Sequence, residues 1–97
     1  KWLPYAEEAD LLNVALFGFT AKAWRDTNPE LAVKSNVRDY ATINELTVLS
    51  NLETHNAQMI REGKSKLDRF MVLKEIAEYQ LRVLNEAEKI NNRIEEL

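Results

Sequence analysis

The sequence contains no cysteine and only two glycines, two prolines and one histidine among its 97 residues. The lack of cysteine excludes a disulfide framework and any thiolate site, although it does not by itself distinguish the cytosol from an oxidising compartment. So few glycines and prolines do not suit the many tight turns of a β-sandwich or barrel. The longest uncharged run, residues 11–21, is well below the roughly 20 apolar residues that cross a bilayer. We expect a soluble, cytoplasmic protein with no membrane span.

The sequence also has no excess of basic residues, since the net charge is -3 and the sequence pI is about 5.2. Nucleic-acid affinity depends on clustered Lys and Arg, so we expect this chain to bind duplex DNA poorly by itself. What is present is 45% hydrophobic and 30% charged residues, enough for a core and a solvated surface. Abundant Leu, Ala, Glu, Lys, Asn and Arg favour helices. The prediction is one all-α domain over 1–97, with its core at about 5–84.

The first half of the chain carries one clear helix signal and several weak ones. Apolar residues at helical spacing predict a helix over 5–17, and Gly18 is placed to end it in the left-handed conformation. Thr20 is a candidate N-cap for a short helical piece, and Asn28 followed by proline reads as a second helix start. The segment 33–41 has no sustained period and reads as a surface connection.

The second half predicts an antiparallel helix hairpin. Thr42 and Glu45 have the spacing of a capping box, which starts a helix ending at Gly63, and Ser65 offers a weaker cap for a last helix. Only one residue separates Gly63 from Ser65, and so short a connection makes the two helices antiparallel neighbours. The expected core residues of the first of these helices are Leu46, Leu49, Leu52, Ala57, Met59 and Ile60. Those of the second are Leu67, Phe70, Met71, Leu73, Ile76, Ala77, Leu81 and Leu84.

The end of the last helix has a different, narrower apolar pattern. Its members are spaced four, three, four and three residues apart, as in the seam of a coiled coil: Val83, Ala87, Ile90, Ile94 and Leu97. A helix over 65–97 would be about 50 Å long, more than the roughly 35 Å diameter of a compact globule of this size. We therefore predict a coiled-coil extension over 83–97 that overhangs the domain and forms a homodimer. The alternatives are that the first helix covers this seam or that the tail frays.

No catalytic, cofactor or metal site is predicted. The single histidine, His55, has no second ligand at helical spacing, and the residue three before it is Leu52, which excludes the Glu-x-x-His pattern of di-iron bundles. Paired acidic residues at 7–8 and 95–96 point around different sides of their helices, so we interpret them as solvated charges. The two isolated glycines leave no phosphate-binding loop.

Two further groups could carry binding. The aromatic residues Phe17, Phe19, Trp24 and Phe70 could form an exposed docking patch, but in a small helical domain core anchors are the expected role. The triplet Arg38, Asp39 and Tyr40 could be a recognition loop, although a salt bridge or a helix start is the preferred interpretation.

Several short motifs follow one another between Tyr5 and about Leu84, and they comprise residues 8–18, 20–22, 24–26, 28–30, 36–39, 49–53, 56–57 and 60–61. In this order they resemble the region after the DNA-binding module in bacterial and phage-related KilA-N domain proteins. The resemblance implies that a KilA-N module precedes Lys1 in a longer protein and is the part that contacts DNA. It supplies no active-site residues, and naming this chain a DNA-binding domain would transfer a function from residues it lacks.

The leading hypothesis is a non-catalytic C-terminal domain that oligomerises or docks a partner and so sets how two DNA-binding modules are arranged. The alternative is an interaction module for a host or phage protein, without self-association. A third, from another class, is a small hydrolase, which a deep, acid-lined cleft would favour. The sequence predicts no membrane partner and no small-molecule substrate.

Overall fold

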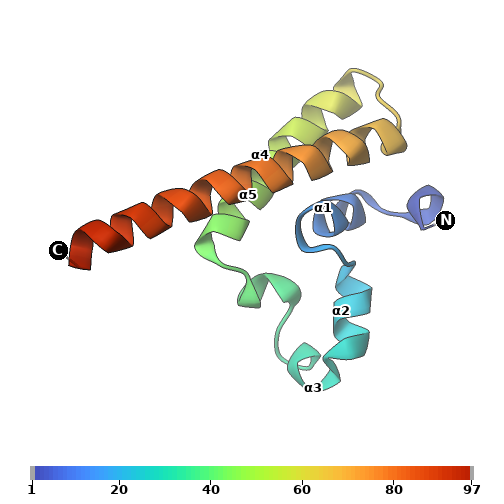
Figure 1. The fold of residues 1–97 in the computed structure, drawn as a ribbon. Coiled ribbons are helices and arrows are strands. Elements are labelled where there is room, and N and C mark those ends of the chain that lie inside the picture. The colour runs from blue at the N-terminus through green and yellow to red at the C-terminus, as the bar shows by residue number, and fades with distance from the viewer. Residues whose placement is uncertain (1, 97) are drawn as a thin grey trace.

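The chain is helical over the residues that the computed structural model describes, 2–96, and no strand occurs among them (Figure 1). This confirms the all-α prediction. The helices are α1 (Glu8–Phe17), α2 (Ala21–Thr27), α3 (Pro29–Ala32), α4 (Ile43–Arg61) and α5 (Lys66–Glu96), and two 3₁₀ turns are η1 (Leu3–Tyr5) and η2 (Val37–Tyr40). Within this part of the chain no helix is both long and apolar enough to span a membrane.

Most of the predicted start and stop signals are confirmed. Gly18 ends α1 with φ 84°, and Gly63 follows α4 with φ 75°, both in the left-handed region where a side chain is strained. The Thr42 hydroxyl accepts the Glu45 N–H at 3.0 Å while the Glu45 carboxylate accepts the Thr42 N–H at 2.8 Å. The hydroxyl of Ser65 accepts a backbone N–H at the start of α5 at 3.1 Å. These local interactions fix where the long helices begin and end.

Of two predicted helix starts in the first half, the first is wrong and the second is confirmed. α1 begins at Glu8 and not at Tyr5, because Tyr5 belongs to η1 and the extended backbone of Ala6 separates the two elements. α3 begins at Pro29 with Asn28 at its N-cap position, as predicted, but the Asn28 side chain makes no capping hydrogen bond to α3. Its amide instead donates to the carbonyl oxygen of Trp24 at 2.9 Å, so this side chain stabilises the end of α2.

The segment read as an irregular connection contains η2. The side-chain oxygen Oδ1 of Asn36 accepts the Arg38 N–H at 3.0 Å, and the Asp39 carboxylate accepts the Asn36 N–H at 2.8 Å. Arg38 also forms an ion pair with Glu53 of α4 at 3.7 Å. A helix start and a salt bridge were the preferred interpretation of these residues, and both are confirmed.

The core lies between α1 and the antiparallel hairpin of α4 and α5 (Figure 1). Asn44 donates to Asn85 and Asn51 donates to Gln80, each at 2.9 Å, so residues early in α4 meet residues late in the opposing helix. The buried apolar residues that cluster there are Leu12, Ala15, Val48, Leu49, Leu52, Met59, Leu73 and Ala77. The two helices of the hairpin thus bury one face each.

Several predicted core residues are exposed. In α4 these are Leu46, Ala57 and Ile60, and in α5 they are Leu67 and Met71. The α4 residues are exposed because α1 and α5 cover only one side of α4. The apolar face of α4 is wider than the area that these two neighbouring helices bury. Among the aromatic anchors, Trp24 is buried, Phe17 and Phe70 are half-buried, and Phe19 is exposed.

The last part of α5 extends past the rest of the molecule, as its length predicts (Figure 1). The helix has 31 residues, and the molecule measures 51 × 38 × 18 Å. Asn44, near the first turn of α4, contacts Asn85 and Glu88. From Asn85 to Glu96 every residue is exposed. We refer to residues 85–96 as the α5 tail.

Candidate interaction surface

A second apolar stripe runs along α5 beside the face that packs in the core, and of its members Ile76 also packs against the core. Its spacing averages about 3.7 residues, close to the 3.6 of a straight helix, so the stripe stays on one face along its length. We call it the α5 stripe, and its members are Val72, Ile76, Tyr79, Val83, Ala87, Ile90 and Ile94. All of them are exposed except Ile76, which is half-buried. Five large apolar side chains exposed on one face of one helix are typical of a docking surface.

The first half of the α5 stripe borders a shallow groove beside α4. Two adjoining hollows, of about 440 and 170 Å³, share Tyr79 and Gln80 in their walls. The α4 side of the groove is polar, because it is formed by Thr47, Asn51 and His55. The groove therefore has one apolar and one polar wall, an arrangement that suits an amphipathic helix.

The second half of the stripe coincides with the predicted coiled-coil seam. The side chains of Ile90 and Ile94 are 57% and 62% exposed, and Val83 and Ala87 are exposed as well. Leu97, the last predicted member, lies outside the described residues. α1 packs against the body of the hairpin and does not extend over the tail (Figure 1). The alternative that the first helix covers the predicted seam is therefore wrong. What the sequence did not indicate is that the stripe starts as early as Val72.

Charged side chains follow one edge of the stripe in the tail. Glu86 and Arg93 are seven residues apart and therefore lie on the same side of the helix. Glu86 also contacts Lys89 at 3.5 Å on the exposed surface. Arg82 lies over the Tyr79 ring at 5.7 Å from its centre, next to the same stripe. The stripe is thus bordered by charges of both signs.

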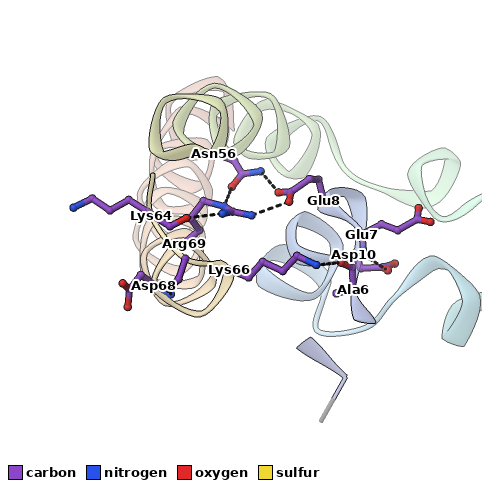
Figure 2. A network of polar contacts seen from close by, with 10 residues as sticks. Ala6, Glu7, Glu8, Asp10, Asn56, Lys64, Lys66, Asp68 and Arg69 are labelled. Atoms are coloured by element: carbon purple, nitrogen blue, oxygen red, sulfur yellow. Dashed lines mark hydrogen bonds and ion pairs between the residues drawn. The ribbon is translucent and has the colours of Figure 1, made fainter. Parts of the chain in front are cut away.

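The most tightly bonded polar group is elsewhere, where three helices meet (Figure 2). The buried guanidinium of Arg69 donates to Glu8 at 2.7 Å, to Asn56 at 3.0 Å and to the carbonyl of Lys64 at 2.7 Å. The Asn56 amide in turn donates to Glu8 at 2.8 Å. These bonds join α1, α4 and the start of α5, so the network holds the three helices of the domain body together.

This network changes the interpretation of Glu8, which was expected to be a solvated charge and is instead an ion-pair partner of a buried arginine. Burial raises the pKa of Glu8, but the hydrogen bonds from Asn56 and Arg69 and the nearby positive charges outweigh it and hold the pKa below its ordinary value of 4.5. The sequence separation of Glu8 and Arg69, 61 residues, explains why no local pattern indicated the pair.

Groups that could carry chemistry are sparse among residues 2–96. No three or more His, Asp or Glu side chains in this range gather as metal ligands would. His55 lies in the wall of the larger hollow with Glu75 as the one acidic residue there. That hollow is not the acid-lined cleft that would favour a hydrolase. The interpretation of the chain as non-catalytic stays a prediction.

The second candidate patch, the aromatic one, is a smaller feature. Phe17, Phe19 and Trp24 line a hollow of about 240 Å³ with Tyr40 on its wall. The Phe17 and Phe19 rings stack with centres 6.0 Å apart, and Trp24 packs on Tyr40 at 5.8 Å. The contact between Trp24 and Tyr40 joins α2 to η2, which indicates a small satellite core at this point.

No family model matches the chain, and no curated protein or solved structure does either. The resemblance to the region after a KilA-N module therefore stays a prediction from the residues quoted for it.

Proposed function

We propose that this chain is a non-catalytic helical module that self-associates through the α5 tail. The observation that carries the proposal is the uncovered apolar face of a helix that extends beyond its own domain. Ile90 and Ile94 in the tail, and Val83 just before it, are large, apolar and exposed in the single chain. Burial of an isoleucine side chain contributes about 1.5 to 3 kcal/mol, so covering this face is strongly favourable.

The shape of the tail also favours a helical partner. An isolated helix of about three turns is marginal in water, because its nucleation is costly and its backbone is solvated. A second helix along the stripe would stabilise it by the packing of a two-stranded coiled coil. The role that follows is to hold two copies of a larger protein together. If a KilA-N module precedes this region, as the sequence resemblance implies, the arrangement of two DNA-binding modules is what self-association sets.

A second candidate function uses the same surface for a different protein. The observation that favours it is the groove beside α4, whose polar wall at Thr47, Asn51 and His55 would orient an amphipathic helix from another chain. In this case the chain is a docking module for a host or phage protein and is itself a monomer.

Sedimentation equilibrium of the full chain separates these two functions. We expect the chain to be a dimer and an Ile90→Asp, Ile94→Asp variant to be a monomer with the same helical circular dichroism. The matched control is Lys89→Gln, Asn92→Asp, which changes the net charge equally on the opposite side of the tail and is expected to stay dimeric. If the unaltered chain and both variants are all monomeric, self-association is wrong and the docking function is favoured.

A further inference from the structure

The α5 tail carries a pattern that distinguishes the two orientations in which a second copy could pack on it. We infer that two copies of this chain pair through residues 81–96 in antiparallel orientation, with Val83 of each copy opposite Ile94 of the other. This inference rests on the proposed self-association and adds its geometry. The argument uses the sizes of the stripe residues and the charges along one edge of the stripe.

Side-chain size favours the antiparallel arrangement. In this register Ala87 of one copy faces Ile90 of the other, so every layer of the seam combines a smaller side chain with a larger one. In a parallel dimer each residue faces its own copy. Ala87 would then face Ala87, which leaves a gap beside the layer of two Ile90 side chains, and gaps in a packed seam are unfavourable.

Charge complementarity points the same way. The edge of the tail that carries Glu86 and Arg93 meets the same edge of the second copy when the helices are antiparallel. In the register given above, Glu86 of each copy lies beside Arg93 of the other, so that two ion pairs form across the dimer. In a parallel dimer the edge positions of one helix meet the opposite edge of the other, and Glu86 then faces Asn91.

The groove beside α4 leaves room for this arrangement. The end of the second copy's tail would lie over Val83, which belongs to the wall of the smaller hollow with Thr47 and Asn51. The overlap of 16 residues corresponds to about 24 Å of paired helix. The bodies of the two copies would lie at opposite ends of the paired tails, so anything joined to the body of each copy would point away from its counterpart.

The absence of cysteine allows a direct test by disulfide trapping in the full chain. Val83→Cys and Ile94→Cys are made as separate variants, and a cross-link requires Cα atoms within about 7 Å of each other. In the antiparallel dimer, only a mixture of the two variants forms a disulfide on oxidation. In a parallel dimer each position lies beside the same position of the other copy, so each variant forms a disulfide with itself. Positions 83 and 94 are about 17 Å apart along the helix, so a disulfide between them does not form in that dimer.

The outcomes separate this inference from the proposed function. Cross-linking in the mixture alone supports the antiparallel register. Self-linked variants, or a dimer that cross-links in neither experiment, overturn the register while self-association stands. Variants and parent chain that all sediment as monomers under reducing conditions overturn both.

A charge reversal gives an independent readout of the same geometry. Glu86→Arg is expected to raise the dimer dissociation constant about tenfold, since it replaces two attractive pairs with two repulsive ones. Glu86→Arg combined with Arg93→Glu is expected to restore it to within about twofold, because the pairs reform with their signs exchanged. If the double reversal is weaker than the single one, the two residues do not face each other across the dimer and the register is overturned.

Discussion

The two halves of α5 belong to one continuous helix but have opposite surroundings. In the half that contacts α1 and α4, Leu73 is fully buried on one face while Val72 and Tyr79 on another face are exposed. The tail has no buried apolar residue, and only the exposed α5 stripe continues along it, through Ile90 and Ile94. The half with two apolar faces is therefore packed within its own chain, and the half with one apolar face lacks a cover. This contrast is the basis of our proposal that another molecule covers the tail.

The largest expected difference in stability is between two truncations of apolar side chains, one in each half of α5. Leu73→Ala removes a fully buried side chain and leaves a cavity, so it is expected to lower the free energy of unfolding by about 4 kcal/mol. Ile90→Ala is expected to change it by less than about 0.5 kcal/mol when measured below the dimer dissociation constant. Urea denaturation followed by circular dichroism checks both. Equal losses from the two substitutions in dilute protein would show that the tail is packed within its own chain.

The next largest effect on the free energy of unfolding is expected from removal of the Arg69 side chain, which joins α1 and α4 to α5. Arg69→Ala leaves Asn56 buried with an unpaired oxygen and Glu8 without its ion-pair partner, so we expect a loss of about 3 kcal/mol in the free energy of unfolding. Arg93→Ala, on the exposed tail, is the matched control and is expected to cost less than about 0.5 kcal/mol in dilute protein. Thermal or urea denaturation measures both. A small effect of Arg69→Ala would contradict the role assigned to the network.

A smaller effect concerns the dependence of stability on pH. The folded-state pKa of Glu8 is held below its ordinary value of 4.5, so the ionised form stabilises the fold above that pH. As the pH falls from there through the folded-state pKa, the carboxylate is protonated and this contribution is lost. Glu8→Gln is expected to lower stability at pH 7 and to weaken the decrease toward acid, as measured by urea midpoints from pH 7 to pH 3. Glu7→Gln is the matched control, and an identical acid decrease in parent and Glu8→Gln chains would contradict the prediction.

The parts of the fold that were predictable from the sequence are those fixed by local chemistry. Gly18, Gly63 and the Thr42–Glu45 capping box act within one helical turn of their own positions, and each is where the sequence placed it. η2 uses the same device, since Asn36 and Asp39 have the spacing of the Thr42–Glu45 pair. The aspartate at the third position is a weaker signal than the usual Glu or Gln, so the sequence favoured a helix start at Arg38, Asp39 and Tyr40 without identifying Asn36 as its cap.

The features that were not predictable depend on contacts distant in sequence. The bonds of Arg69 to Glu8 span 61 residues, and a buried arginine inside a helix looks like a surface residue until its partner is known. The exposure of Leu67 and Met71 also follows from tertiary arrangement, because periodicity shows that a face is apolar and not whether a neighbour covers it. For the same reason the apolar spacing over residues 83–94 could be read from the sequence, while the exposure of the α5 stripe as far back as Val72 required the positions of α1 and α4.

Hydrogen exchange of the α5 tail tests the central claim most directly. Backbone amides of residues 85–96 are measured by mass spectrometry at a series of protein concentrations, with peptides from α4 as the internal reference. If a second copy covers the tail, its protection will rise with concentration and then level off, and Ile90→Asp, Ile94→Asp will abolish the rise. Protection that is the same at every concentration in the parent chain would contradict self-association through this surface.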